Sequence, residues 1–148
     1  MSGNVFVDTN VLVYARDSSE ARKQPVARNW MEQLWRTRRG RVSVQVLNEY
    51  FVTVTMKLKP GLPAKAAWAD VEDLFAWSPI PVSVALLAKT REIHETCQLS
   101  WWDAQIVAAA RLAGCRFLLT EDLQDGQDLD GVRIVNPFAH RADDILSP

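Results

Sequence analysis

Cysteine and histidine are scarce in this chain, with two residues of each among 148. Cys97 and Cys115 are too few for a disulfide framework, and with only His94 and His140 beside them they make a poor zinc site. Long apolar runs are also missing, because none approaches the roughly 18 residues of a membrane span. We therefore expect a cytoplasmic protein in a reducing compartment, with no membrane partner.

A large net charge is missing as well, since the chain carries a formal charge of only −1. The charges are nevertheless unevenly distributed. Residues 1–59 hold ten Lys and Arg against five Asp and Glu, whereas residues 60–148 hold seven against thirteen. A near-neutral total therefore hides a basic and an acidic part, and it does not exclude a nucleic-acid partner once bound cations are counted.

The length and the 48% of hydrophobic residues predict one globular domain, residues 1–148, with a substantial core. Short apolar runs alternate with amphipathic stretches, which is typical of βαβ construction. We expect strands at 4–7, 41–44, about 80–82, 116–120 and 132–135, and helices at 11–16, 25–38, 45–57, 64–77, 84–96 and 101–113. The predicted fold class is α/β, with a mostly parallel five-stranded sheet covered by helices on both faces.

Four acidic residues fall where such a sheet places its functional sites, beyond the carboxyl ends of the strands. Asp8 follows the first strand and Asp122 follows the strand at 116–120. Glu49 lies one turn into the helix after the second strand, and Asp103 begins the helix that precedes 116–120. We expect the four carboxylates to converge.

Each acid also has a purely structural explanation. Asp8 could cap the first helix, and Ser100 to Asp103 matches the S-x-x-D pattern of a capping box. Glu49 could be a solvated helix residue at the rim of the apolar face. Asp122 stands in an acidic loop beside Glu121, with further acids at 125 and 128, so the fourth acid could be misassigned by a residue or a turn.

Together the four acids favour a hard divalent cation, because Mg²⁺ and Mn²⁺ prefer carboxylate oxygen whereas histidine and cysteine would favour zinc. Acidic clusters of this kind serve phosphodiester hydrolysis, in which the metal activates water and neutralises charge on the phosphate. The sequence contains neither a phosphate-binding loop nor a plausible Ser/His/Asp triad.

With these residues in view, the chain resembles the PIN-domain family, and within it the VapC-type ribonuclease toxins of bacterial toxin–antitoxin pairs. The resemblance covers nearly the whole length. Its markers are the segments Val7-Asp8-Thr9-Asn10-Val11-Leu12, Asn48-Glu49, Leu99-Ser100-Trp101-Trp102-Asp103-Ala104, Leu119-Thr120-Glu121-Asp122-Leu123-Gln124 and Asn136-Pro137-Phe138.

The resemblance implies a three-layer α/β/α sandwich and a Mg²⁺- or Mn²⁺-dependent endoribonuclease. It implies Asp8 and Asp103 as the most direct metal ligands, Asp122 as a direct or water-mediated ligand, and Glu49 as the group that orients or deprotonates the attacking water. Supporting positions are Asn10, Thr120 and the neighbouring Glu121. The resemblance also implies a homodimer that a cognate antitoxin silences.

Several residues could bind RNA. Arg36, Arg38, Arg39 and Arg41 cluster before the second strand, either as phosphate contacts or as a solvated helix end. Trp102, beside Asp103, could stack on an exposed base. The tryptophans at 30, 35, 68 and 77 are expected to serve mainly in packing, and some of them could line an antitoxin groove or a dimer face.

Two other functions compete with the nuclease. An aspartate-nucleophile phosphatase needs a second acid two residues after the first, but Asn10 stands there. A non-catalytic RNA-binding or protein-interaction module on the same fold remains the alternative, and only an activity measurement separates it from the enzyme.

Overall fold

Five strands form a single sheet in the order β2-β1-β3-β5-β4 in the computed structural model, which describes residues 2–147. The strands are β1 (Asn4–Val7), β2 (Gly40–Arg41), β3 (Cys115–Leu119), β4 (Asp128–Leu129) and β5 (Val132–Val135). All neighbours pair in parallel except β4 and β5, which are antiparallel. The predicted five-stranded, mostly parallel sheet is confirmed.

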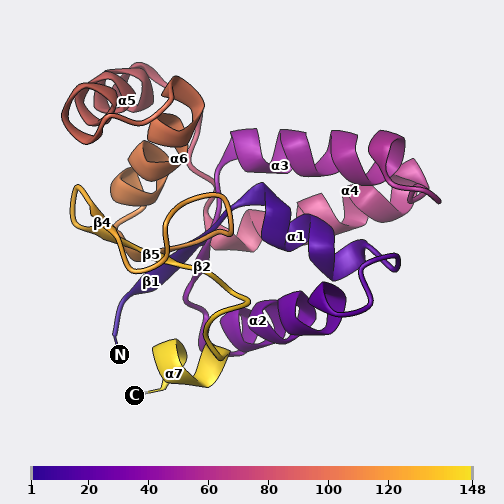
Figure 1. Cartoon of the computed structure of the whole chain (residues 1–148). Helices are drawn as coiled ribbons and strands as arrows, with labels where there is room; N and C mark the ends of the chain where they lie inside the picture. Colours follow the sequence, from indigo (N-terminus) through magenta and orange to yellow (C-terminus); the bar gives the residue numbers. More distant parts are fainter. Residues whose placement is uncertain (1, 148) are drawn as a thin grey trace.

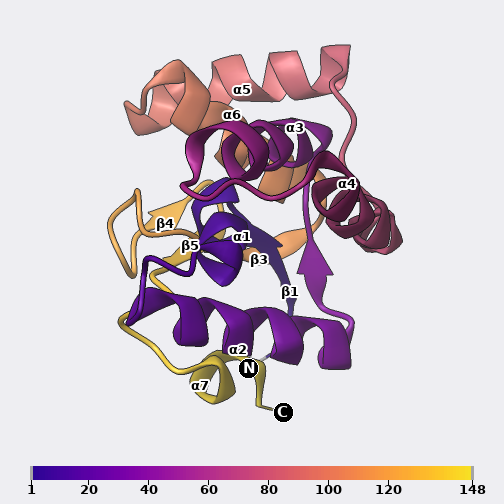
Figure 2. The same ribbon diagram turned by 90° about the vertical axis from the view of Figure 1, so that its right-hand side faces the viewer.

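Helices cover both faces of this sheet. They are α1 (Thr9–Arg16), α2 (Lys23–Thr37), α3 (Val44–Val52), α4 (Ala64–Asp73), α5 (Val84–Cys97), α6 (Trp101–Leu112) and α7 (Ala142–Leu146). A π-helical turn (Thr53–Lys57) extends α3, and a 3₁₀ turn (Leu74–Trp77) extends α4. Figures 1 and 2 show α5 and α6 on one side of the sheet and α2 and α7 on the other, which is the predicted α/β/α sandwich.

The identity of one strand differs from the prediction. Segment 80–82 forms only an isolated bridge, between Ile80 and Ser43, because Pro79 and Pro81 on either side have no N–H to donate to a ladder. The fifth strand is instead β4, whose two residues are too short to show any alternation of polar and apolar side chains. The second strand is also shorter than expected, because the Ser43 hydroxyl accepts from the Val46 N–H and begins α3.

The helix predictions need smaller corrections. Helix α2 begins at Lys23, before the proline taken as its start, and α7 was not predicted although it buries Ala142, Ile145 and Leu146. On the helix at 64–77, Trp68 and Phe75 lie half-exposed, in edge-to-face contact with each other. They belong to an apolar surface and not to the core.

The carboxyl ends of the three central strands meet at one edge, and this positions the candidate site. Strands β1, β3 and β5 are almost wholly buried, so their backbone groups must pair with each other. The ladder continues one residue past the strands, where Asp8 N–H donates to the Leu119 carbonyl (3.1 Å) and Thr120 N–H to the Val135 carbonyl (3.0 Å). Asp8 and Thr120 are thereby fixed at the same edge.

A search of the helices within residues 2–147 finds none with the length and hydropathy of a membrane span.

Candidate active site

Asp8 is both the cap of α1 and the centre of a polar cluster. Its Oδ1 accepts a hydrogen bond from the Thr9 backbone N–H at 2.7 Å, which is the capping role that the sequence allowed. Its Oδ2 accepts from the Thr120 hydroxyl at 2.8 Å and lies 3.3 Å from the Asn10 amide nitrogen. Capping therefore uses one oxygen and leaves the other facing the carboxyl edge of the sheet.

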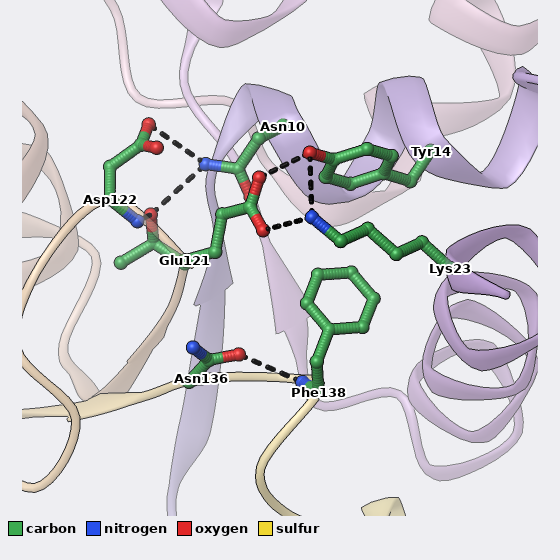
Figure 3. Close-up of polar contacts among 8 residues, drawn as sticks. Asn10, Tyr14, Lys23, Glu121, Asp122, Asn136 and Phe138 are labelled. Atoms are coloured by element: carbon green, nitrogen blue, oxygen red, sulfur yellow. Dashed lines mark hydrogen bonds and ion pairs between the residues drawn. The ribbon is translucent and has the colours of Figure 1, made fainter. Parts of the chain in front are cut away.

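Asn10 and Thr120 link Asp8 to Asp122. The Asn10 Nδ2 lies 3.1 Å from the Thr120 Oγ1 and 3.1 Å from the Asp122 Oδ2. The Thr120 Oγ1 also accepts from the Asp122 backbone N–H at 3.1 Å. Figure 3 shows Asn10 reaching from α1 toward Asp122. Two residues predicted to support the site thus hold two of its acids in place.

Glu49 reaches the same region from α3. Its Oε2 accepts from the Thr9 hydroxyl at 2.8 Å, and its Oε1 accepts from the Gln45 amide at 3.1 Å. Since Thr9 follows Asp8 directly, this bond brings the third acid beside the start of α1. The side chain remains exposed, as its position at the rim of the apolar face predicts.

Asp103 lies at the start of α6, where only half of the predicted capping box is formed. The Ser100 hydroxyl accepts from the Asp103 backbone N–H at 3.2 Å. The reciprocal bond, from the Asp103 carboxylate back to Ser100, is not found within residues 2–147, and neither is any other partner for that carboxylate. Capping therefore does not occupy the carboxylate of Asp103.

The acids influence each other through their charges. Burial raises the pKa of Asp8 to about 6, although the hydrogen bonds from Thr120 and Thr9 act in the opposite direction. The negative charges of Asp122 and Glu49 raise the pKa of Asp8 further. A cation between these groups would relieve both the burial penalty and the repulsion.

The donor chemistry fits a hard divalent ion such as Mg²⁺ or Mn²⁺, because every candidate ligand is a carboxylate. The Oδ1 of Asn10 is a further buried oxygen, and it lacks a hydrogen-bond partner within the described part of the chain. In residues 2–147, however, no three His, Cys, Asp or Glu side chains are drawn together tightly enough to hold an ion as they stand. Asp122 and Glu49 are exposed and Asp103 is part-buried, and binding would require these carboxylates to move from their positions here.

The other acids after β3 have separate partners. Glu121 accepts from the Tyr14 hydroxyl and pairs with Lys23 at 2.9 Å. Asp125 accepts from the Asn136 N–H and pairs with His140, both at 2.8 Å, and Asp128 accepts from the Gly131 N–H at 2.9 Å. Asp122, in contrast, contacts Asn10, which favours it over these neighbours as the fourth acid.

Sequence reasoning missed Tyr14 and Lys23, which pack beside the site together with Phe138 of the marker segment Asn136-Pro137-Phe138. The Lys23 ammonium lies 4.8 Å from the centroid of the Tyr14 ring and 5.1 Å from that of Phe138, and the two rings meet edge to face. Two signals could have found them. Tyr14 falls one helical turn after Asn10, and Lys23 is a cation in the first turn of a helix, where the dipole favours an anionic neighbour.

The arginines proposed to contact RNA lie elsewhere. Arg36, Arg38 and Arg39 precede β2, and Arg41 is its last residue, with a side chain that donates back to the Arg38 carbonyl, whereas the acids gather at the carboxyl edge of the sheet. Arg39 donates to the carbonyls of Gly3 (2.6 Å) and Leu146 (3.0 Å), and so ties the two ends of the described chain together. Arg41 donates to the Gly40 carbonyl at 2.7 Å. Any phosphate contact from Arg36, Arg38, Arg39 or Arg41 would therefore be remote from the acids.

Trp102 differs from the arginines, because it stands next to Asp103 and its surface is 65% exposed. Its neighbour Trp101 packs edge to face against His94 instead. An exposed indole beside a carboxylate is a suitable surface on which a base could stack.

We expect Thr120→Val to destabilise the protein by about 2 kcal/mol at pH 7, because the fully buried hydroxyl bonds both Asp8 and the Asp122 backbone. Urea unfolding with and without Mg²⁺ measures this difference. Thr120→Ser keeps the hydroxyl and should recover most of the loss. Equal destabilisation by both variants would show that the hydroxyl contributes no more than the methyl group, and an unchanged stability of Thr120→Val would contradict the role of the hydroxyl.

Comparison with known proteins was made for sequence and for structure. The family profile described as PIN domain matches residues 5–141, and no curated protein matches the chain. A toxin–antitoxin complex from Klebsiella pneumoniae contains a similar chain, with a TM-score of 0.61 and 20% identity over 90% of this chain and 98% of that one. The structure of FitAB bound to an IR36 DNA fragment gives a TM-score of 0.66 and 17% identity over 90% and 95%. At these identities the structural likeness establishes the fold.

Proposed function

Because the chain belongs to the PIN domain family, we propose that it is a divalent-metal-dependent endoribonuclease, the VapC-type toxin of a toxin–antitoxin pair. The observation that carries this proposal is the coupling of Asp8, Asp122 and Glu49 at the carboxyl edge of the sheet. The two structural relatives, whose printed descriptions name a toxin–antitoxin complex and FitAB, support a role of this kind.

The proposed roles are those that the resemblance to the family implies, and the contacts of Glu49 support one of them. Asp8 and Asp103 would bind Mg²⁺ or Mn²⁺ most directly, with Asp122 as a direct or water-mediated ligand. When bound, the ion activates water and offsets charge on the phosphate. Thr9 and Gln45 each occupy one oxygen of Glu49, which holds this carboxylate ready to orient the attacking water or accept its proton. Hydrolysis would leave 5′-phosphate and 3′-hydroxyl ends.

A protein partner is part of the proposal, and an apolar groove of about 470 Å³ between α3 and α4 supports it. Trp68, Phe75 and Val52 line the groove and are 50%, 51% and 42% exposed. Clustered aromatic side chains at a surface are typical of protein interfaces. A cognate antitoxin or the second protomer of a homodimer would cover this surface in a cytoplasmic complex.

The test is cleavage of matched single-stranded RNA and DNA by the purified protein with Mg²⁺, with Mn²⁺ and with EDTA. We expect cleavage of RNA only, dependent on the metal, with 5′-phosphate at the new ends. Trp102→Ala should weaken cleavage of unpaired RNA about tenfold through loss of base stacking. Cleavage that persists in EDTA would contradict the metal site, and RNA binding without cleavage would favour the non-catalytic module.

Expression in bacteria is a complementary measurement, since a toxin should arrest growth. We expect arrest by the wild type and relief by Asp8→Ala or Asp103→Ala. Harmless expression of a protein that cleaves RNA in vitro would contradict the toxin assignment while leaving the nuclease in place.

A further inference from the structure

We propose that Glu121, Tyr14 and Lys23 form a positioning clamp that fixes Asp122 for metal binding. The inference rests on the proposed function, because it concerns the same acidic site. It assigns roles to three side chains that do not themselves contact Asp8, Glu49 or Asp103.

The clamp is one of two adjacent attachments between α1 and the segment after β3. On α1, Asn10 contacts Thr120 and Asp122. One helical turn later, the Tyr14 hydroxyl donates a hydrogen bond to Glu121. Three consecutive residues, 120 to 122, are therefore each bonded to the first helix or to its cap. Figure 3 shows Glu121 directed toward Tyr14 while Asp122 is directed toward Asn10.

Lys23 extends the clamp to α2. Its ammonium lies 2.9 Å from the second oxygen of Glu121 and 3.3 Å from the Tyr14 hydroxyl. The hydrogen bonds to Glu121 and Tyr14 raise the pKa of Lys23 above its usual value. Because α2 has no acidic residue in its first turn and no side-chain cap, the Glu121 carboxylate also supplies the negative charge that a helix amino terminus favours.

Phe138 contacts two members of the clamp, Tyr14 and Lys23. Asn136 accepts from the Phe138 backbone N–H at 2.9 Å, and this turn places the Phe138 ring against both Tyr14 and Lys23. The closing segment Asn136-Pro137-Phe138 therefore acts on the site indirectly, by confining the residues that hold Glu121.

The clamp matters because Asp122 is exposed and, within residues 2–147, its carboxylate accepts from a single side chain, that of Asn10. Without Glu121 fixed beside it, the backbone at 121 and 122 could move away from Asp8, and the carboxylate would have to be ordered by the ion itself. Residues that orient metal ligands typically change metal affinity by 10- to 100-fold when they are altered.

An electrostatic role and a positioning role for Lys23 predict opposite changes in cation affinity for the variant Lys23→Met. Lys23→Met removes the cation that pairs with Glu121 and so adds uncompensated negative charge near the site. Electrostatics alone would tighten cation binding, whereas loss of positioning would weaken it. Tyr14→Phe changes no charge, keeps the ring against Phe138, and removes only the hydroxyl.

The measurement is the affinity of the full chain for Mn²⁺ alone, by titration calorimetry without RNA, so that it does not depend on cleavage. We expect both Tyr14→Phe and Lys23→Met to bind Mn²⁺ about tenfold more weakly than the wild type. Tight binding by the wild type with no cleavage would overturn the proposed function alone.

The chain offers a matched control. Tyr50 donates to Asp70 at 2.5 Å, and Asp70 pairs with Arg16 at 2.6 Å, which is the same tyrosine–carboxylate–cation chemistry away from residues 120 to 122. Tyr50→Phe should lower thermal stability while keeping the Mn²⁺ affinity of the wild type. Unchanged affinity in Tyr14→Phe, tighter binding in Lys23→Met, or an equal loss in Tyr50→Phe would each overturn the clamp.

Discussion

Replacement of Asp8 by asparagine should lower RNA cleavage by at least about 1,000-fold while the protein remains folded. Asp8 is the acid on which the contacts converge, and one of its oxygens already caps α1. Asparagine keeps an oxygen that can accept from the Thr9 N–H, so the helix start survives. It removes the negative charge on which a divalent ion depends, and the loss of one such group has an effect on this scale.

The measurement compares initial cleavage rates at saturating Mn²⁺, with circular dichroism to show that the variant is folded. Asp128→Asn is the matched control, because an oxygen of Asp128 likewise accepts from a backbone N–H, that of Gly131 at 2.9 Å, in the β4–β5 turn. The control should retain nearly full activity. Comparable activity in Asp8→Asn and the wild type would remove Asp8 from the site, and an equal loss in both variants would indicate an effect that is not specific to Asp8.

The parts of the fold that could be predicted are those with long or fully apolar signals. Strands β1, β3 and β5 could be predicted from the sequence, because buried parallel strands are nearly continuous apolar runs. The edge of the sheet could not be predicted in the same way. Two-residue strands carry no periodicity, and the pairing of Asp128 and Leu129 with β5 depends on the turn at Asp130 and Gly131, both at positive φ.

The candidate site also has features that the sequence predicts and features that it does not. The proximity of Asp8 and Asp122 could be predicted because topology brings the ends of β1 and β3 together, whatever the details of the loops. The separation of Glu121 from Asp122 could not, since adjacent residues in a loop point in directions that only tertiary contacts decide. The arginine cluster shows the same limit, because a run of charge in the sequence does not say that β2 places it at the opposite edge from the acids.

In the absence of metal, the contribution of Asp8 to the stability of the protein should fall as the pH rises from 4 to 7. The pKa of Asp8 is raised from 3.8 to about 6 in the folded protein. Its protonated form therefore stabilises the fold fully below the pKa of the unfolded chain, and this contribution is lost as the pH passes through about 6. A shift of this size corresponds to about 3 kcal/mol at neutral pH.

Other groups also titrate over this range, so the informative quantity is the difference between wild type and Asp8→Asn. Urea unfolding in EDTA at pH 5 and pH 7.5 should show a steeper loss for the wild type, because asparagine has no charge to bury.

Added Mg²⁺ should restore the wild type at pH 7.5 and leave Asp8→Asn nearly unchanged, since an ion that binds only the folded state stabilises it by an amount that grows with the ratio of the ion concentration to its Kd. Parallel pH profiles for the two proteins would contradict the raised pKa of Asp8. A Mg²⁺ effect of equal size in both would place the ion away from Asp8. The two outcomes separate the burial of this carboxylate from its use as a ligand, and the proposed enzyme requires both: a charge that is unfavourable in the empty fold is one that a bound cation can offset.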